Sequence, residues 1–217
     1  PRLLDVSEDR EFLGYEDYSL YKARGENILR SSKFKNWTII RPAITYSKHR
    51  FQLVTLEANT VVARARQSKP VLVPKKAMEI RGTMSWGGDI AEMIARLVLN
   101  KDAICEIFTV STAEHNAWKT VAEYYKELIG LCVIPVETET YLNCFDNYWG
   151  ARYQLIYDRF FDRIVDNSKI LRVTGMKQSE LMPLYKGLEK ELSALPKDYD
   201  FGSFYVNDNM DKILKTL

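Results

Sequence analysis

The sequence predicts an α/β protein with a mostly parallel sheet, and two observations support this. Short β-branched runs alternate with longer segments of helical periodicity, and proline or glycine residues separate many of them. Alternation of this kind is typical of strands joined by helical crossovers, which makes neighbouring strands parallel. The convincing strands are residues 37–40, 70–74, 106–110 and 133–136.

Helices are expected between and after these strands. Asp17 or Ser19 can cap the helix that ends near residue 32, and Asp89 can cap the helix over residues 90–99. Asn116 can cap the helix over residues 118–129, and Gly130 ends that helix. The predicted helices cover residues 17–32, 51–66, 90–99, 118–129, 141–162, 166–175 and 179–192, and an aromatic, polar tail follows.

The composition excludes several classes of protein. The 31 basic and 29 acidic residues give a net charge of +2, and no Lys/Arg run exceeds two residues, so we expect no nucleic-acid partner. The longest apolar runs are too short for a membrane span. Three widely spaced cysteines without a CxxC and two histidines predict buried free thiols and no metal site, which suits a reducing, cytoplasmic setting.

The first candidate for chemistry is the pair Tyr18 and Lys22. A spacing of four residues places both side chains on one face of a helix. A phenol with a pKa of about 10 is a poor acid or base near neutrality. An ammonium group a few ångströms away favours the phenolate, so such a pair can transfer a proton.

Further motifs follow this pair in order. They are Trp-Thr-Ile-Ile-Arg-Pro-Ala-Ile-Thr-Tyr at 37–46, Met-Ser-Trp-Gly-Gly-Asp-Ile-Ala-Glu-Met-Ile-Ala at 84–95, the strand and helix at 106–110 and 118–123, and Asp-Asn-Ser-Lys-Ile at 166–170 before Thr174-Gly175. Together they resemble the C-terminal portion of the extended short-chain dehydrogenases/reductases, the NAD-dependent epimerase/dehydratase family. The resemblance covers the chain from Tyr18 to about Leu192.

The resemblance implies the C-terminal part of a Rossmann-like, doubly wound parallel sheet and a smaller, mostly helical substrate-binding domain. The family's glycine-rich cofactor loop is absent from the sequence and is expected upstream of Pro1, as is its Ser/Thr partner of the tyrosine. The implied division is residues 1–48 for the Rossmann-like part, 49–80 for a substrate-domain segment, 81–112 for a return to the Rossmann-like layer, and 113–217 for the substrate-binding domain and C-terminal helices.

The resemblance also implies a site. Tyr18 is the catalytic acid/base and Lys22 its partner, and a nucleotide sugar or similar sugar is the substrate. Lys22, Pro42, Ile44 and Thr45 are implied to contact NAD or NADP, and Tyr46 and Arg81 to contact substrate. Two departures leave the substrate open, because Ile44 stands where many members carry Asn and Arg81 is one place out of register.

Several alternatives remain open at this point. Arg41-Pro42 can be a simple strand stop, and the aromatic stretch 141–161 is either core or a cap over a sugar pocket. Three arginines on or near this stretch, Arg152, Arg159 and Arg163, can meet a diphosphate, but solvated charges offset by Asp158 and Asp162 are the favoured interpretation.

The predicted function stays equally broad. Epimerase, dehydratase and reductase share the Tyr/Lys pair, and a non-catalytic cofactor sensor or scaffold with the same fold is the alternative. We also expect a homodimer through helix 18–32, because related enzymes commonly dimerise through the helix that bears the YxxxK motif.

Overall fold

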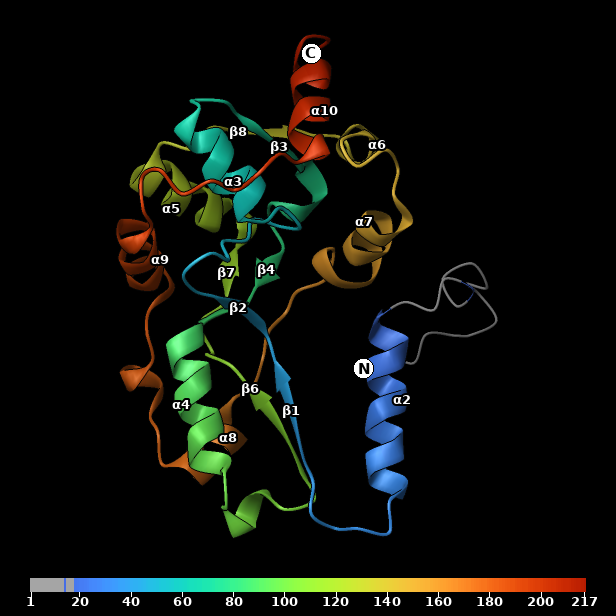
Figure 1. Ribbon diagram of the computed structural model, residues 1–217, viewed down its shortest axis with the longest axis vertical. Helices are drawn as coiled ribbons and strands as arrows, with labels where there is room; N and C mark the ends of the chain where they lie inside the picture. Colours follow the sequence, from blue (N-terminus) through green and yellow to red (C-terminus); the bar gives the residue numbers. More distant parts are fainter. Residues whose placement is uncertain (1–13, 15–17) are drawn as a thin grey trace.

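The computed structural model describes Gly14 and residues 18–217 (Figure 1). The strands are β1 (Thr38–Pro42), β2 (Ile44–Tyr46), β3 (Val71–Pro74), β4 (Arg81–Gly82), β5 (Met84–Trp86), β6 (Glu106–Val110), β7 (Asn116–Ala117) and β8 (Val133–Val136). The helices are α2 (Tyr18–Ser31), α3 (Ala58–Arg66), α4 (Gly87–Leu97), α5 (Trp118–Ile129), α6 (Thr138–Asn143), α7 (Trp149–Gln154), α8 (Ser168–Thr174), α9 (Leu184–Ala194) and α10 (Tyr205–Leu214).

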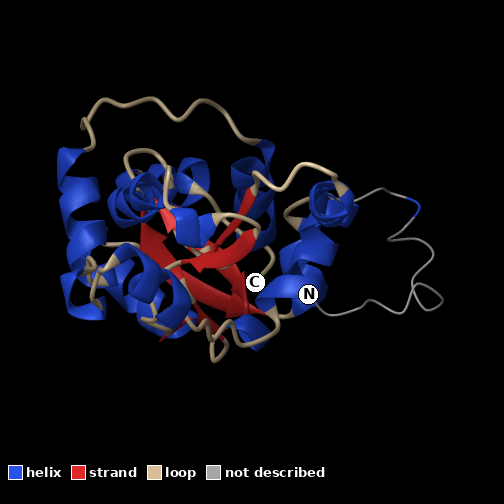
Figure 2. Ribbon diagram, turned by 90° about the horizontal axis from the view of Figure 1, so that it is seen from below, coloured by secondary structure: helices blue, strands red, loops and turns tan. Residues whose placement is uncertain are grey.

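Parallel strand pairs form the middle of the molecule. Strand β1 pairs with β6, β2 with β5, and β3 with β8, and each of these pairs is parallel. The short pair β4–β7 is antiparallel. Helices surround the strands when the molecule is viewed from below (Figure 2). The predicted α/β class with mostly parallel strands is therefore confirmed.

Two apolar clusters hold the strands and helices together. The smaller cluster joins β6, α4 and α8 through Phe108, Met93 and Ile170, each of which is fully buried. The larger cluster lies at the other end of the molecule, around α3, β3 and α5, and includes Val61, Leu72 and Tyr125. The segment from β1 to β2 runs between these two ends (Figure 1).

The C-terminal helix α10 is fixed to α3 by a buried arginine. Arg64 is only 1% exposed, and its guanidinium donates hydrogen bonds to the carbonyl oxygens of Pro70 and Asn207. Its Nη2 also donates to Asp211 Oδ1 over 2.7 Å, and Lys69 binds the second oxygen of that carboxylate. Burial raises the pKa of Asp211, but the bonds from Lys69 and Arg64 outweigh it, so the pKa is lowered overall.

The predicted helix over residues 51–66 is wrong in its first half, because α3 begins only at Ala58. Leu53 and Leu56 exchange two backbone hydrogen bonds across a tight turn, and Val54 at its corner has a φ of 57°. Every residue of the turn is buried, so its apolar residues do not mark one face as they would in an amphipathic helix. Arg159 Nε donates to the Val54 carbonyl over 2.8 Å and holds the turn in place.

The predicted helix over residues 141–162 is interrupted. Helix α6 ends at Asn143, and Asp146 and Asn147 adopt left-handed conformations with φ of 51° and 54°. Asp and Asn tolerate this conformation better than other non-glycine residues, so they break the helix here. The chain resumes as α7 and then as a π-helical turn, Leu155–Arg159.

Several predicted ends also need correction. Asp89 lies in the first turn of α4 instead of capping it, and Asn116 belongs to β7, with Ala117 before helix α5. Ser19 is the second residue of α2, and the other proposed cap, Asp17, lies outside the described residues. The last predicted helix begins five residues late, at Leu184, and the predicted tail contains helix α10.

The cysteines differ from their predicted burial. Cys144 is buried, Cys105 is half-buried and Cys132 is exposed, and all three are free thiols. Within the described part of the chain, every helix is too short or too polar to span a lipid bilayer.

Asp211→Ala should lower the free energy of unfolding by about 1–3 kcal/mol, because it leaves the buried Arg64 guanidinium without one acceptor. In the wild type, this contribution is present above the unfolded carboxyl pKa of about 4 and is lost as the pH falls through the lower folded value. Urea unfolding at neutral and acidic pH measures both effects.

The matched control is Glu189→Ala, which removes a partly exposed carboxylate from the ion pair with Lys186. This change should cost less than about 0.5 kcal/mol. Equal losses from the two variants would show that the Arg64–Asp211 contact does not anchor α10.

Candidate active site

Tyr18 and Lys22 meet on one face of helix α2, as their spacing predicts. The Lys22 Nζ lies 5.1 Å from the centroid of the Tyr18 ring, within the range of a cation–π contact. Both side chains are exposed, and the Tyr18 ring has 71% of its surface accessible. An accessible phenol beside an ammonium group is an arrangement that can exchange protons with a bound molecule.

Helix α2 is joined to strand β1 by an ion pair that the sequence analysis did not foresee. Arg41 Nε donates to Glu26 Oε1 over 2.7 Å, and Arg41 Nη2 donates to Glu26 Oε2. The hydrogen bonds from Arg41 lower the pKa of Glu26, and the bonds to Glu26 raise the pKa of Arg41. Glu26 follows Lys22 by one further helical turn, but nothing in the sequence pairs it with Arg41.

The proposed cofactor residues lie directly after this contact. Pro42 ends β1 with an exposed ring, and Ile44 and Thr45 are half-buried in β2, where they pair with Met84 and Ser85 of β5. The Thr45 hydroxyl accepts a weak hydrogen bond from Arg50 over 3.3 Å. The structure therefore places Pro42, Ile44 and Thr45 on the extended segment of β1 and β2, directly after Arg41.

Tyr46, a predicted substrate contact, is buried in this structure. The side chain is 1% exposed, and its buried hydroxyl has no hydrogen-bond partner among the residues that the structure describes. Burial raises the pKa of Tyr46, and the charges of Glu114, Asp89 and Glu191 raise it further. The hydroxyl faces Gly187 of α9 so closely that a Cβ at that position would lie 1.9 Å away.

Arg81, the other predicted substrate contact, is exposed but paired. Its Nη2 donates to Asp162 Oδ2 over 2.7 Å, and its backbone N–H donates to the other oxygen of the same carboxylate over 2.8 Å. These bonds lower the pKa of Asp162. An anionic ligand at Arg81 would have to compete with Asp162 for the guanidinium.

Of the three neighbouring arginines, only Arg159 differs from the predicted solvated charges, because Arg152 and Arg163 are exposed. Arg159 is 5% exposed, and burial together with the charge of Arg163 lowers its pKa to about 10. The Asp158 carboxylate forms ion pairs with both Arg159 and Arg163. Arg152 is exposed and lies 3.6 Å from Glu139, as expected of a surface charge.

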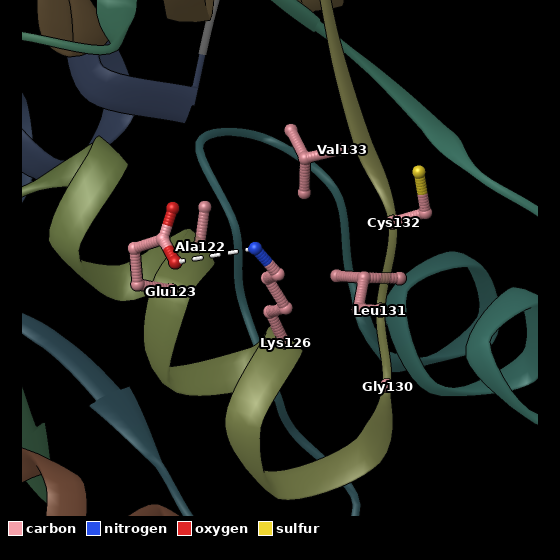
Figure 3. Close-up of a pocket in the computed structure, with 7 residues that line it drawn as sticks. All are labelled: Ala122, Glu123, Lys126, Gly130, Leu131, Cys132 and Val133. Atoms are coloured by element: carbon pink, nitrogen blue, oxygen red, sulfur yellow. Dashed lines mark ion pairs between the residues drawn. The ribbon is translucent and has the colours of Figure 1, made fainter.

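A hollow of about 250 Å³ lies between α5 and β8, away from these residues (Figure 3). Glu123 and Lys126 form an ion pair across 3.9 Å within it, and the Cys132 thiol lies on its other side. None of its lining residues belongs to the predicted site. Among the described residues, no cluster of His, Cys, Asp and Glu could hold a metal ion.

No protein-family model and no curated protein matches the chain by sequence. Solved structures do match it by fold. A Thermotoga maritima UDP-glucose 4-epimerase with UDP-glucose has a TM-score of 0.57 at 17% identity, covering 83% of this chain and 52% of that one. A Thermus thermophilus UDP-glucose 4-epimerase in complex with NAD has a TM-score of 0.54 at 18% identity, covering 80% and 50%.

A Methanothermobacter thermautotrophicus epimerase has a TM-score of 0.59 at 12% identity and covers 91% of this chain and 51% of that one. The chain thus spans about half the length of the structures it matches. At these identities the likeness shows the fold. The chain has the partial Rossmann-like α/β fold of UDP-glucose 4-epimerases and related epimerases, and this is the fold class that the sequence predicted.

Gly187→Ala should destabilise the protein by about 1–3 kcal/mol, because the added methyl group would overlap the Tyr46 hydroxyl. Tyr46→Phe removes a buried hydroxyl without a partner and should be neutral or stabilising by about 1 kcal/mol. Combining the two should recover part of the loss, because they act on the same contact. Urea unfolding of the four proteins measures this coupling, and strictly additive effects would contradict it.

Proposed function

We propose that this chain carries the acid/base residues of an NAD(P)-dependent epimerase, dehydratase or reductase that acts on a nucleotide sugar or a similar sugar. The observation that carries the proposal is the Tyr18–Lys22 pair, which shares one exposed helix face at 5.1 Å. The fold supports it, because matching structures include epimerases in complex with UDP-glucose and with NAD.

The two residues have separate roles in this proposal. The Tyr18 phenol exchanges a proton with a hydroxyl of the substrate, since its oxygen is the titratable atom of the pair. The Lys22 ammonium favours the ionised phenol by its charge, and it can donate a hydrogen bond to a ribose hydroxyl. A non-catalytic sensor has no need of an accessible phenol beside an ammonium group.

The donor set fits the nicotinamide end of the cofactor. Lys22 offers an ammonium group and Thr45 a hydroxyl, which are suitable donors for ribose and carboxamide oxygens. Pro42 and Ile44 offer an apolar edge for a ring. NAD or NADP, when bound, supplies the acceptor and donor of hydride, and the residues named here hold and orient it.

Arg81 is the proposed contact for an anionic part of the substrate. Its guanidinium, which now donates from both Nε and Nη2 to the single oxygen Oδ2 of Asp162, can bind a diphosphate with two parallel hydrogen bonds. Tyr46 belongs to the same proposal, but its buried hydroxyl reaches a substrate only if α9 moves away from it.

The proposal extends to organisation and assembly. It places the boundaries between the Rossmann-like part and the substrate-binding domain after residues 48, 80 and 112. It also includes a cytoplasmic location and a homodimer. Helix α2 supports the homodimer, because Ile28 is 72% and Leu29 40% exposed on it. Such apolar side chains are common in contacts between subunits.

Tyr18→Phe in the protein at its full natural length should lower kcat by about 10²–10⁴-fold, because only the ionisable oxygen is lost. Cofactor affinity should change less than threefold. Lys22→Met should weaken both turnover and cofactor binding. Steady-state kinetics on UDP-sugars and calorimetric titration with NAD and NADP measure the two effects.

The matched control is Tyr21→Phe, which removes another exposed phenol from the same helix and should keep turnover within about twofold of the wild type. Wild-type turnover in Tyr18→Phe would refute the proposed acid/base. An active cofactor site with no turnover of any sugar would favour the sensor or scaffold.

A further inference from the structure

Helix α2 depends on polar contacts for its position. It has no buried residue, and along its length only Leu20 and Glu26 are even half-buried. In the view of Figure 1 it stands beside the molecule, and the chain from Ser32 to Trp37 carries it to β1 without regular structure. A helix of 14 residues is marginal on its own in water, so a contact that fixes it has a large effect on where its side chains lie.

The contact between Glu26 and Arg41 has the geometry needed to fix it. Two guanidinium nitrogens of Arg41 bind the two oxygens of one carboxylate. A bidentate pair of this kind sets the orientation as well as the distance, which a single hydrogen bond does not. Arg30 adds a weaker contact to the same carboxylate at 3.7 Å and shares its helix.

The pair also joins the two halves of the proposed site. Tyr18, Lys22 and Glu26 follow one another at four-residue spacing and lie along one helix face. At 1.5 Å per residue, Glu26 is about 12 Å along the axis from Tyr18. On the other side of the pair, Arg41 immediately precedes Pro42, where the proposed cofactor segment begins.

We propose that Glu26 and Arg41 are positioning residues, which fix the Tyr18–Lys22 face of α2 against the segment from Pro42 to Thr45. This inference rests on the proposed function. A displacement of about 1 Å at a reacting group can cost about 10²-fold in rate, so loss of the pair acts mainly on kcat. A simple strand stop at Arg41-Pro42 would explain the end of β1 but not the contact to α2.

The decisive experiment uses the protein at its full natural length. Glu26→Gln removes the charge and one acceptor, and Arg41→Lys keeps the charge but loses the two-nitrogen geometry. Both should lower kcat by about 10–100-fold and change the KM for the sugar less than threefold. The exchanged pair Glu26→Arg with Arg41→Glu should restore kcat to within about fivefold of the wild type, which a purely local defect of either residue would not allow.

Hydrogen exchange supplies a readout that does not depend on turnover. Backbone amides of α2 should exchange at least about tenfold faster in Glu26→Gln, because the helix loses its attachment, and the exchanged pair should recover protection. Glu92→Gln is the control, since it breaks an exposed glutamate–arginine ion pair, with Arg96, that lies within helix α4 and joins no other element. It should alter neither kcat nor the exchange of α2.

The outcomes separate the two proposals. If Tyr18→Phe is inactive while Glu26→Gln keeps wild-type kcat and α2 protection, the positioning role is refuted and the acid/base role stands. If Tyr18→Phe is fully active, the proposed function fails, and faster exchange of α2 in Glu26→Gln would then show only a structural attachment. Failure of the exchanged pair to restore both kcat and protection would also refute the positioning role.

Discussion

The extended segment from Thr38 to Tyr46 is the constraint on which the arrangement of the molecule depends. Its first part, β1, is paired along its whole length with β6, and its second part, β2, is paired with β5. Strand β6 of the first pair contributes Phe108 and Val110 to the small apolar cluster. Strand β2 of the second pair contributes Tyr46 to the larger cluster. The same segment carries Arg41, which binds α2.

This constraint explains why the candidate site depends on so few contacts. Strands β1 and β2 are held firmly by backbone hydrogen bonds on the side that faces β6 and β5, whereas the Tyr18–Lys22 helix is attached mainly through side chains at its surface. Glu26 and Arg41 are both partly exposed, so water weakens their attraction. The contact therefore adds little stability, and its main effect is to fix the orientation of α2 relative to β1. Neither apolar cluster includes the proposed acid/base residues Tyr18 and Lys22, so their alignment depends on surface contacts and not on the packing of the core.

The sequence predicted the parts of the structure that local chemistry decides. Strand 106–110 was correct at both ends, helix 118–129 ends at Gly130 with a φ of 69°, and Gly175 ends α8 in the same way. It failed where tertiary contacts decide. Residues 51–56 are apolar yet form a buried turn, because Arg159, Tyr125 and Tyr141 bind its polar groups from other elements.

The site divides along the same line. The contact of Tyr18 with Lys22 follows from helix spacing, and it was predicted. Three other contacts were not predicted, because each joins residues far apart in the sequence: Tyr46 packs on Gly187, Arg81 pairs with Asp162, and Arg41 binds Glu26. Their partners lie 15 to 141 positions apart, and neither composition nor periodicity specifies such pairs. Gly187 gave no signal, because the need for a missing Cβ arises only when the Tyr46 ring packs against α9.

In the proposed function, Tyr18 exchanges the hydroxyl proton of a carbinol of a nucleotide sugar while NAD takes up the hydride from its carbon. The most direct measurement is the absorbance of reduced nicotinamide after the protein at its full natural length, loaded with NAD, is mixed with UDP-sugars. Reduced nicotinamide should form with at least one sugar in the wild type and should be absent in Tyr18→Phe with the same amount of NAD bound. Equal amounts in both proteins, or none in a wild type that binds NAD and the sugar, would contradict the proposed function.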